Sequence, residues 1–172
     1  YNELSFKKLS DDNPGLIIHD FNRYISLKSF VSEPQMYINH NDTLCDSLRL
    51  NPLFDEIYNP FHSQIHCNKK YFMSLLKGKN MITIKKNKNN LYLIHQIYGE
   101  SKLYLFNPKH VRDINGKTNE NIKKYGQKIN LTQGLVLYIP IEWYYFYESE
   151  DESIIGEIIS DNYFTVIYNN IR

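Results

Sequence analysis

The sequence has few cysteines, no excess charge of either sign and no long apolar run. Its two cysteines, Cys45 and Cys67, lie far apart and form no C-x-x-C pair, so the sequence predicts neither a zinc site nor a disulfide framework. We expect both thiols to be reduced and buried. No apolar run reaches the ~18 residues that span a membrane, and the first residues lack the apolar core of a signal peptide. We therefore expect an intracellular protein without a membrane segment.

The balance of charge disfavours a further class of function. The 172 residues carry 20 Lys and Arg against 19 Asp and Glu, which gives a net charge of +1. Such a mixed surface creates no basic field, so nonspecific binding to nucleic acid is disfavoured. A chain of this length forms one domain, or one domain with an appendage, and can bury most of its apolar surface.

The densest pattern of the sequence lies in residues 131–149. Residues 135–139 form an apolar run that favours a strand, and Pro140 ends it. A second strand opens at Trp143 and continues through four consecutive aromatic residues. Aromatic side chains on both faces of a strand suit a sheet that is covered on both sides. We therefore expect two strands joined by a tight turn, with Trp143 and, in an earlier strand, Phe106 buried in the core.

Shorter elements are expected on either side of this stretch. They are a helix over residues 20–29, a strand over 33–39, a helix over 43–50 that Asn41 or Asp42 can cap and Pro52 closes, and strands over 71–76, 153–159 and 163–168. The polar residues 110–128 are expected to form an exposed excursion, with a turn at Asn115 and Gly116 and solvated side chains at Lys123 and Lys124. About seven short strands separated by turn signals are typical of an antiparallel sandwich or barrel.

Two strand-forming stretches together resemble a known family. GLVLYIPIEWYYF is similar to the element G-D-V-L-Y-I-P-x-x-W-W-H of the JmjC and cupin-like 2-oxoglutarate oxygenases, in particular their asparaginyl-hydroxylase branch. Residues 92–108 resemble the same family's strand pair N-x-x-x-Q-I-x-G-x-K-x-x-x-L-F-P-P, with Gln96, Gly99 and Phe106 in register. The resemblance covers residues 80–168. It implies a mainly β fold, a double-stranded β-helix of the cupin or jelly-roll type, with a few N-terminal helices.

The resemblance also implies where an iron site would lie, and the residues there differ from the family pattern. Its second histidine falls on Tyr145, and its H-x-D pair falls on Lys86 and Lys88 when counted back from Gly99. An ammonium group has no lone pair and repels a dication, and a phenol with a pKa of about 10 binds Fe(II) poorly. We therefore expect no metal, no catalytic residue and no Fe(II) or 2-oxoglutarate cofactor. The two lysines should reach water or pair with a carboxylate such as Glu142 or Glu157, and Tyr145 and Tyr92 should narrow the cavity.

Five further positions match the family's cofactor pocket. They are Thr83, Tyr92, Ser101, Lys102 and Ile167. Ser101 falls where the family has the lysine that pairs with 2-oxoglutarate. Lys102 is one step away and would point to the other face of the strand, so it cannot substitute without a bulge. The barrel is expected over residues 80–172, and residues 1–79 are expected to be a lead-in with short helices and strands packed on it.

Three functional classes remain open. The first is a catalytically degenerate JmjC-like domain that acts as a non-enzymatic protein-binding or assembly module, with another protein as its partner. The second is an active Fe(II)/2-oxoglutarate-dependent protein hydroxylase or histone demethylase whose relocated ligands come from His62, His66, His95 and nearby acids. His62 and His66 would share a helix face, but we interpret them as surface or loop residues. The third is a cupin that binds a small anion through Lys86 and Lys88.

Overall fold

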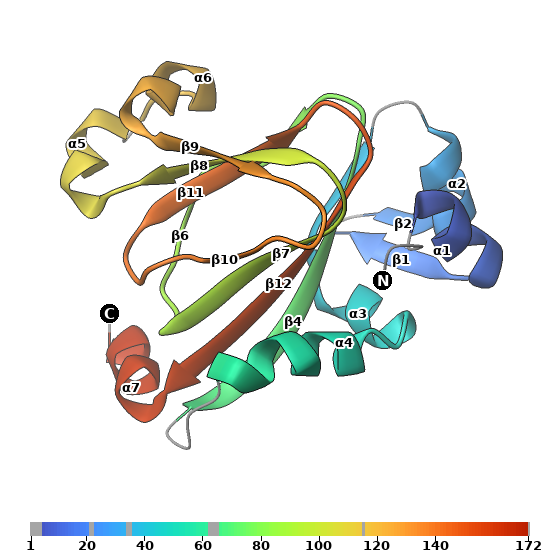
Figure 1. Ribbon diagram of the computed structural model, residues 1–172, viewed down its shortest axis with the longest axis horizontal. Coiled ribbons are helices and arrows are strands. Elements are labelled where there is room, and N and C mark those ends of the chain that lie inside the picture. Colours follow the sequence, from blue (N-terminus) through green and yellow to red (C-terminus); the bar gives the residue numbers. More distant parts are fainter. Residues whose placement is uncertain (1–4, 21–22, 34–35, 62–65, 115, 172) are drawn as a thin grey trace.

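The computed structural model describes residues 5–20, 23–33, 36–61, 66–114 and 116–171 (Figure 1). Short helices and a hairpin come first: α1 (Phe6–Asp12), β1 (Ile17–Asp20), β2 (Arg23–Ser26), α2 (Leu27–Ser32), β3 (Met36–Asn41), α3 (Asp42–Ser47), α4 (Asn51–Tyr58) and the 3₁₀ turn η1 (Asn59–Phe61). The following strands are β4 (His66–Lys77), β5 (Asn80–Met81), β6 (Lys85–Lys86), β7 (Leu91–Gly99), β8 (Ser101–Phe106), β9 (Gln127–Leu131), β10 (Val136–Tyr138), β11 (Tyr144–Ser149) and β12 (Ser153–Asn162). Between β8 and β9 lie η2 (Pro108–His110), α5 (Val111–Ile114), α6 (Asn119–Ile122) and η3 (Lys123–Tyr125), and α7 (Tyr163–Ile171) follows β12.

β1 and β2 form a small two-stranded sheet, and the strands from β3 onward form two antiparallel sheets that face each other (Figure 1). The first sheet has the order β10-β7-β12-β4-β3, and the second has the order β5-β11-β8-β9 with β6 also paired to β11. From β4 onward the pairing is nested: β4 pairs with β12, β5 and β6 with β11, β7 with β10, and β8 with β9. This nesting is the jelly-roll arrangement of cupins. The expected fold, a mainly β double-stranded β-helix with a few N-terminal helices, is confirmed.

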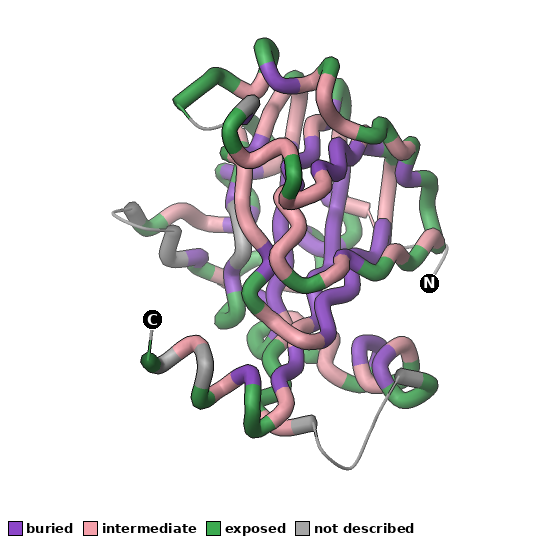
Figure 2. The backbone as a smooth tube through the Cα atoms, turned by 90° about the vertical axis from the view of Figure 1, so that its left-hand side faces the viewer, coloured by how far each residue is buried: buried purple, intermediate pink, exposed green. Residues whose placement is uncertain are grey.

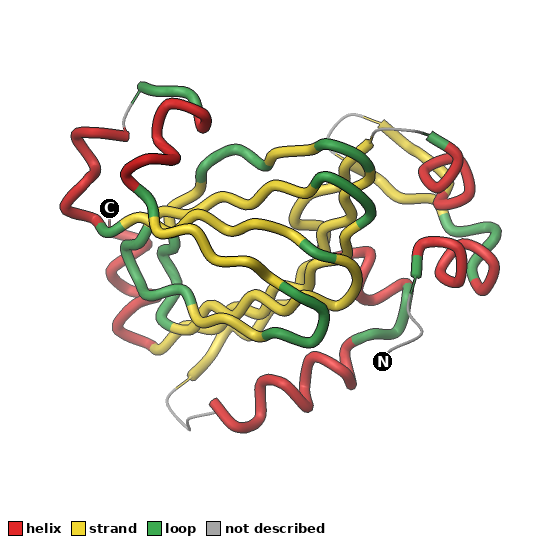
Figure 3. The backbone as a smooth tube through the Cα atoms, turned by 45° about the horizontal axis from the view of Figure 1, so that its top comes forward, coloured by secondary structure: helices red, strands yellow, loops and turns green. Residues whose placement is uncertain are grey.

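The apolar residues form three layers. The middle layer lies between the two sheets and includes Leu103, Ile139 and Ile155. A second layer fills the space between the first sheet and the N-terminal helices, and a third joins the outer face of the second sheet to α5 and α6. Figure 2 shows the buried residues running along the central strands, and Figure 3 shows helices gathered around them. Both sheets are therefore covered on both faces, as the aromatic run predicted.

The domain boundary expected between residues 79 and 80 is corrected. β4 ends at Lys77, yet it pairs along nearly its whole length with β12 and belongs to the barrel. β3 pairs in turn with β4 and extends the same sheet. A boundary at residue 79 would divide hydrogen-bonded neighbours, so the barrel begins with β4 and the lead-in supplies one further strand.

Two expected elements near the N-terminus also differ. The helix expected over residues 20–29 is divided between β2 and α2, since residues 23–26 pair with β1. Asn41 caps α3 as expected, because its Oδ1 accepts from the Leu44 amide at 2.8 Å. Pro52 lies in the first turn of α4, a position that suits a residue without an amide hydrogen. It therefore opens a second helix and does not only close the first.

The strand expected over residues 163–168 is a helix. These residues have high strand propensity, but β12 already has a partner on each side, in β4 and β7. Asn162 ends β12, and its Oδ1 accepts from the Thr165 amide at 2.8 Å, which caps the first turn of α7. A helix cap, together with the strands that already occupy both sides of β12, thus overrides the local preference.

The excursion of residues 110–128 is not wholly exposed. Ile114 and Ile122 are buried against Phe106 and Phe146 on the outer face of the second sheet. Lys123, expected to be solvated, pairs with Glu120 and Glu148. The turn expected at Asn115 and Gly116 falls partly outside the described residues, although Gly116 has a φ of 71°.

The other expectations for the core are confirmed in part. Phe106 is fully buried, while Trp143 is half-buried and packs against the layer between the sheets. Both cysteines are free thiols, Cys45 buried and Cys67 half-buried. Burial raises the pKa of the Cys45 thiol, which keeps it protonated and unreactive. Among the described residues, no helix has the length and apolar character needed to cross a membrane.

Gly99 provides a test of the barrel turn that follows β7. Gly99 and Gly134 both have positive φ, 70° and 86°, but only at Gly99 would an added Cβ collide with backbone, 2.0 Å from the Glu152 carbonyl oxygen. We expect Gly134→Ala to cost only the ~1 to 2 kcal/mol of a left-handed alanine. Gly99→Ala should cost clearly more, because the β7–β8 and β11–β12 turns must separate. Urea unfolding of both variants measures the difference, and equal costs would contradict this packing.

Candidate functional site

The interior of the barrel holds a carboxylate surrounded by hydroxyl groups. Glu157 of β12 is fully buried, and its Oε1 accepts from Ser74 Oγ of β4 at 2.9 Å and from Tyr147 OH of β11 at 3.0 Å. Tyr92 OH of β7 donates to Glu157 Oε2. Tyr145 OH of β11 in turn donates to Tyr92 OH at 2.5 Å. We call these five residues the tyrosine–glutamate network.

The sequence places these side chains together through strand alternation. Tyr145 and Tyr147 are two residues apart on β11 and share its inner face, while Phe146 between them faces outward. Across the first sheet, Glu157 is opposite Phe72 on β4 and Ile94 on β7. The network therefore joins strands of both sheets across the space between them.

Burial determines the chemistry of the network. A carboxyl group buried away from water needs hydrogen-bond partners, and three hydroxyl groups supply them here. Burial raises the pKa of the Tyr92, Tyr145 and Tyr147 phenols well above their usual range, and the negative charge of Glu157 raises it further. The phenols therefore keep their protons at neutral pH and act as donors.

The predicted metal positions do not come together. Lys86 is opposite Tyr144 on β11, and its Nζ lies 5.7 Å from the centre of that ring, on the outer side of the sheet. Tyr145 is opposite Lys85, so Lys85 shares its inner face. The expectation that Lys86 and Lys88 occupy inward-facing ligand positions is thus corrected: the inward-facing residues are Lys85 and Asn87, one position earlier in the chain. A register shift of one residue moves every side chain of a strand to the other face.

Asn87 is the inward residue between these two lysines, and the sequence reasoning missed it. It is buried, its Nδ2 donates to the Ile139 carbonyl at 2.8 Å, and its amide donates to the Trp143 carbonyl at 2.8 Å. Its carbonyl accepts from the Glu142 amide at 2.8 Å. Asn87 therefore holds the tight turn between β10 and β11. The sequence signal that could have identified it is its place between two lysines, because strand alternation puts it on the face opposite to theirs.

One of the two carboxylates expected to compensate the lysines does so. Lys86 Nζ forms an ion pair with Glu142 in the turn that Asn87 holds. Glu157, the other candidate, accepts hydrogen bonds in the interior from the hydroxyl groups of Ser74, Tyr92 and Tyr147. Lys88 is exposed, and its carbonyl accepts from Asn169 of α7 at 2.9 Å. An anion site inside the barrel formed by Lys86 and Lys88 is therefore not supported, because neither points inward.

The expected cofactor-pocket positions are also separated. Tyr92 belongs to the interior network, but Thr83 is exposed. Ser101 is buried and its Oγ donates to Gln96 Oε1 at 2.5 Å. Lys102 faces outward as expected and pairs with Glu150. Ile167 lies on α7 with its side chain 57% exposed, so its assignment to the pocket is corrected: the residue is helical and outside the barrel.

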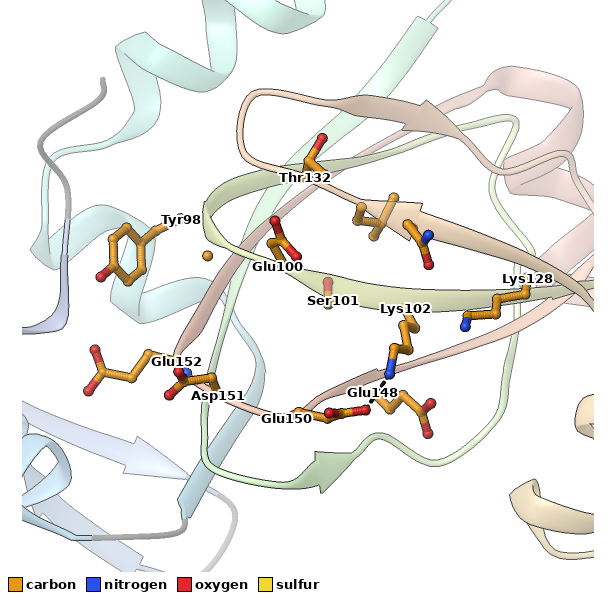
Figure 4. Close-up of a pocket in the computed structure, with 13 residues that line it drawn as sticks. Tyr98, Glu100, Ser101, Lys102, Lys128, Thr132, Glu148, Glu150, Asp151 and Glu152 are labelled. Carbon is orange, nitrogen blue, oxygen red and sulfur yellow. Dashed lines mark hydrogen bonds and ion pairs between the residues drawn. The ribbon is translucent and has the colours of Figure 1, made fainter.

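A surface pocket of about 610 Å³ opens where the β7–β8 and β11–β12 turns meet (Figure 4). Its lining includes the carboxylates of Glu100, Glu148, Glu150, Asp151 and Glu152 and the ammonium groups of Lys102 and Lys128. Figure 4 shows Lys102 reaching Glu150 across this pocket. Buried Ser101 and Leu131 form part of its wall, and Gln96 behind Ser101 donates to Ser153 Oγ at 2.8 Å. The pocket lies at the barrel end and contains no member of the interior network.

The donor set of the interior does not fit the iron site of the resembled family. A 2-His-1-carboxylate site needs two imidazoles beside a carboxylate, whereas Glu157 is surrounded by three protonated phenols and a serine. Within the described ranges, no three His, Cys, Asp or Glu residues lie close enough to hold a metal.

The relocated ligands considered above are not assembled either. His95 lies on the outer face of the first sheet, opposite Gly156, and a Cβ at Gly156 would contact Phe54 of α4. Burial lowers the pKa of the His95 imidazole, and its buried Nδ1 has no hydrogen-bond partner in the described part of the chain. His62 and the side chain of His66 lie outside what the structure describes.

Loss of a single phenolic hydroxyl should destabilise the network measurably. Tyr147→Phe keeps the ring but removes a donor from buried Glu157, and leaving such a group under-satisfied costs ~1 to 3 kcal/mol. The exposed Tyr138→Phe is the matched control and should change the unfolding free energy by less than ~0.5 kcal/mol. Denaturant titration compares the two variants. Similar effects would mean that the Tyr147 hydroxyl contributes nothing to holding Glu157.

The raised phenol pKa values predict sensitivity to alkali. Above pH ~10 the unfolded chain loses the protons of Tyr92, Tyr145 and Tyr147, whereas the folded chain keeps them. The folded state then binds more protons, so the unfolding free energy falls as pH rises, and this contribution is intact below pH ~9. Tyr92→Phe should make the fall above pH ~10 shallower, and Tyr138→Phe should leave it unchanged. Denaturant unfolding at a series of pH values measures the slope, and identical slopes for Tyr92→Phe and the parent would refute the assignment.

Comparison with known proteins gives distant structural matches only. No protein-family model matches the chain, and no curated protein matches it. A cupin superfamily protein of Desulfitobacterium hafniense is 12% identical with a TM-score of 0.41, over 59% of this chain and 72% of that one. The Schizosaccharomyces pombe Cnp3 cupin domain is 8% identical with a TM-score of 0.43, over 64% and 66%. Bacillus subtilis oxalate decarboxylase is 14% identical with a TM-score of 0.41, over 55% and 22%. At these values no activity or ligand transfers to this chain, and its cupin-type fold rests on the nested strand pairing.

Proposed function

We propose that this chain is a catalytically degenerate JmjC-like cupin domain that works without iron or 2-oxoglutarate, as a protein-binding or assembly module. The observation that supports the proposal is the tyrosine–glutamate network, which fills the space between the two sheets with hydrogen bonds among its own side chains. A metal entering this space would have to displace phenolic protons that burial holds in place.

Two further features support the loss of the cofactor site. Ser101 falls at the position of the lysine that pairs with the keto acid in the resembled family. Its hydroxyl group donates a hydrogen bond to Gln96. Lys102 points away from the interior and is paired with Glu150 at the surface. Neither residue offers a cation to a carboxylate inside the barrel. No comparable observation favours the oxygenase or the small-anion alternative, so the module reading stands as the proposal.

The proposal predicts that the interior does not take up metal. Anaerobic titration of the protein with Fe(II) or Mn(II), with and without 2-oxoglutarate, should give no stoichiometric binding by calorimetry and no keto-acid turnover when oxygen is added. Uptake of one metal per chain together with turnover would refute the degenerate reading in favour of an oxygenase.

Two matched triple variants test whether the space can be reopened. Lys85→His, Asn87→Asp and Tyr145→His together place candidate ligands on the inner face. The matched control combines Lys86→His and Lys88→Asp with the same Tyr145→His, so that two of its three candidate ligands lie outside the barrel. We expect neither to bind metal tightly, and the first to melt lower because it also loses the Asn87 amide group that holds the β10–β11 turn. Tight metal binding by the inner variant at an unchanged melting temperature would show a preserved cavity and contradict a filled interior.

A further inference from the structure

The exposed face of the last helix is apolar. On α7, Phe164 and Ile171 are each 81% exposed, Tyr163 is 66% exposed and Ile167 is 57% exposed. We call these four residues the α7 patch. Their spacing places them along one side of the helix, and the sequence of α7, YFTVIYNNI, contains no charged residue.

Two polar side chains lie on the packed side of α7. Thr165 is buried, with its hydroxyl bound to Asn162 Oδ1 at 3.0 Å. Asn169 is half-buried and its Nδ2 donates to the Lys88 carbonyl at 2.9 Å. A surface helix normally turns its apolar side to the core. The reversed orientation here leaves the apolar side for a partner.

The patch has the size of a small specific interface. Its two aromatic side chains carry about 150 to 250 Å² each, and with the two isoleucines the exposed area is on the order of 500 Å² per chain. Two such patches in contact would bury about 1,000 Å², the lower limit for a specific protein interface. Because neither patch carries charge, each is complementary to another copy of itself, whereas a basic or acidic partner would find no counter-charge.

We propose that the α7 patch is the contact through which two copies of this chain form a reversible dimer. The proposal deepens the assembly role proposed above and rests on it, since it names a second copy as the partner. In a twofold contact the same patch serves both chains. With the two helices antiparallel and the axis near Ile167, Phe164 of each copy lies opposite Ile171 of the other.

Sedimentation velocity over a series of protein concentrations tests the dimer. The wild-type chain should shift from monomer to dimer as its concentration rises. Ile171→Glu buries an unpaired charge in the contact and should weaken association roughly tenfold or more. Ile17→Glu is the matched control, because Ile17 is 63% exposed and lies on β1, away from α7. This variant should dimerise as the wild-type chain does. Both changes lie at exposed positions, and circular dichroism verifies that each variant is folded.

Mixing variants tests the antiparallel geometry. Ile171→Glu and Phe164→Lys chains should each remain monomeric alone and associate when mixed, because the carboxylate of one then lies opposite the ammonium of the other. A mixture that stays monomeric overturns the geometry. The dimer would be overturned if the wild-type chain stayed monomeric at every concentration or if Ile171→Glu left the dimer unaffected. It would also be overturned if the monomer bound phosphatidylcholine vesicles through the α7 patch instead. Metal titration reports only on the barrel interior, so failure of the dimer leaves the degenerate-cupin proposal to be judged separately.

Discussion

The burial of the Glu157 carboxylate is the constraint on which the rest of the barrel interior depends. A charge in that position must be given hydrogen bonds or the fold loses several kcal/mol. The donors come from β4, β7 and β11, so the two sheets must approach closely enough for hydroxyl groups to meet across them. The same requirement fixes the phenols as protonated donors and leaves the space without the imidazoles that a cupin iron site uses. The hydrogen bonds that Glu157 needs are thus also the contacts that fill the interior.

Strand alternation connects this interior to the surface. Lys86 and Lys88 lie outside because Asn87 between them lies inside, where it holds the β10–β11 turn. That turn presents Glu142 to Lys86, so the outer ion pair and the inner hydrogen bonds depend on the same short segment. Lys86 and Lys88 therefore require no buried ammonium group. Glu157 is buried instead, where hydroxyl donors offset the cost.

The coverings of the two sheets explain why α7 differs from the other helices. α4 places Phe54 against Gly156 on the first sheet, and the excursion places Ile114 and Ile122 against the second. In both cases the apolar side of the segment meets a sheet. By the time the chain reaches α7 the sheet faces are occupied, and this helix packs through polar contacts near residue 88 with its apolar side outward. An assembly role for the domain is consistent with that arrangement.

The sequence by itself determined several strands of the two sheets, the turn after Pro140 and the antiparallel sandwich or barrel class, because alternation, turn residues and aromatic runs are local signals. The jelly-roll type was implied by the family resemblance. It also indicated that Tyr145 and Tyr92 would fill the interior and that Lys86 could pair with Glu142. Only the tertiary structure decided the rest. The face of a side chain depends on the pairing register, which the sequence does not fix to the residue. The expected inward-facing positions were Lys86 and Lys88, whereas the structure has Lys85 and Asn87 there. Residues 163–168 form a helix where β12 already has a partner on each side and Asn162 caps the next turn, and neither fact can be read from their own strand propensity. The donors to Glu157 come from three strands distant in sequence and have no local signature.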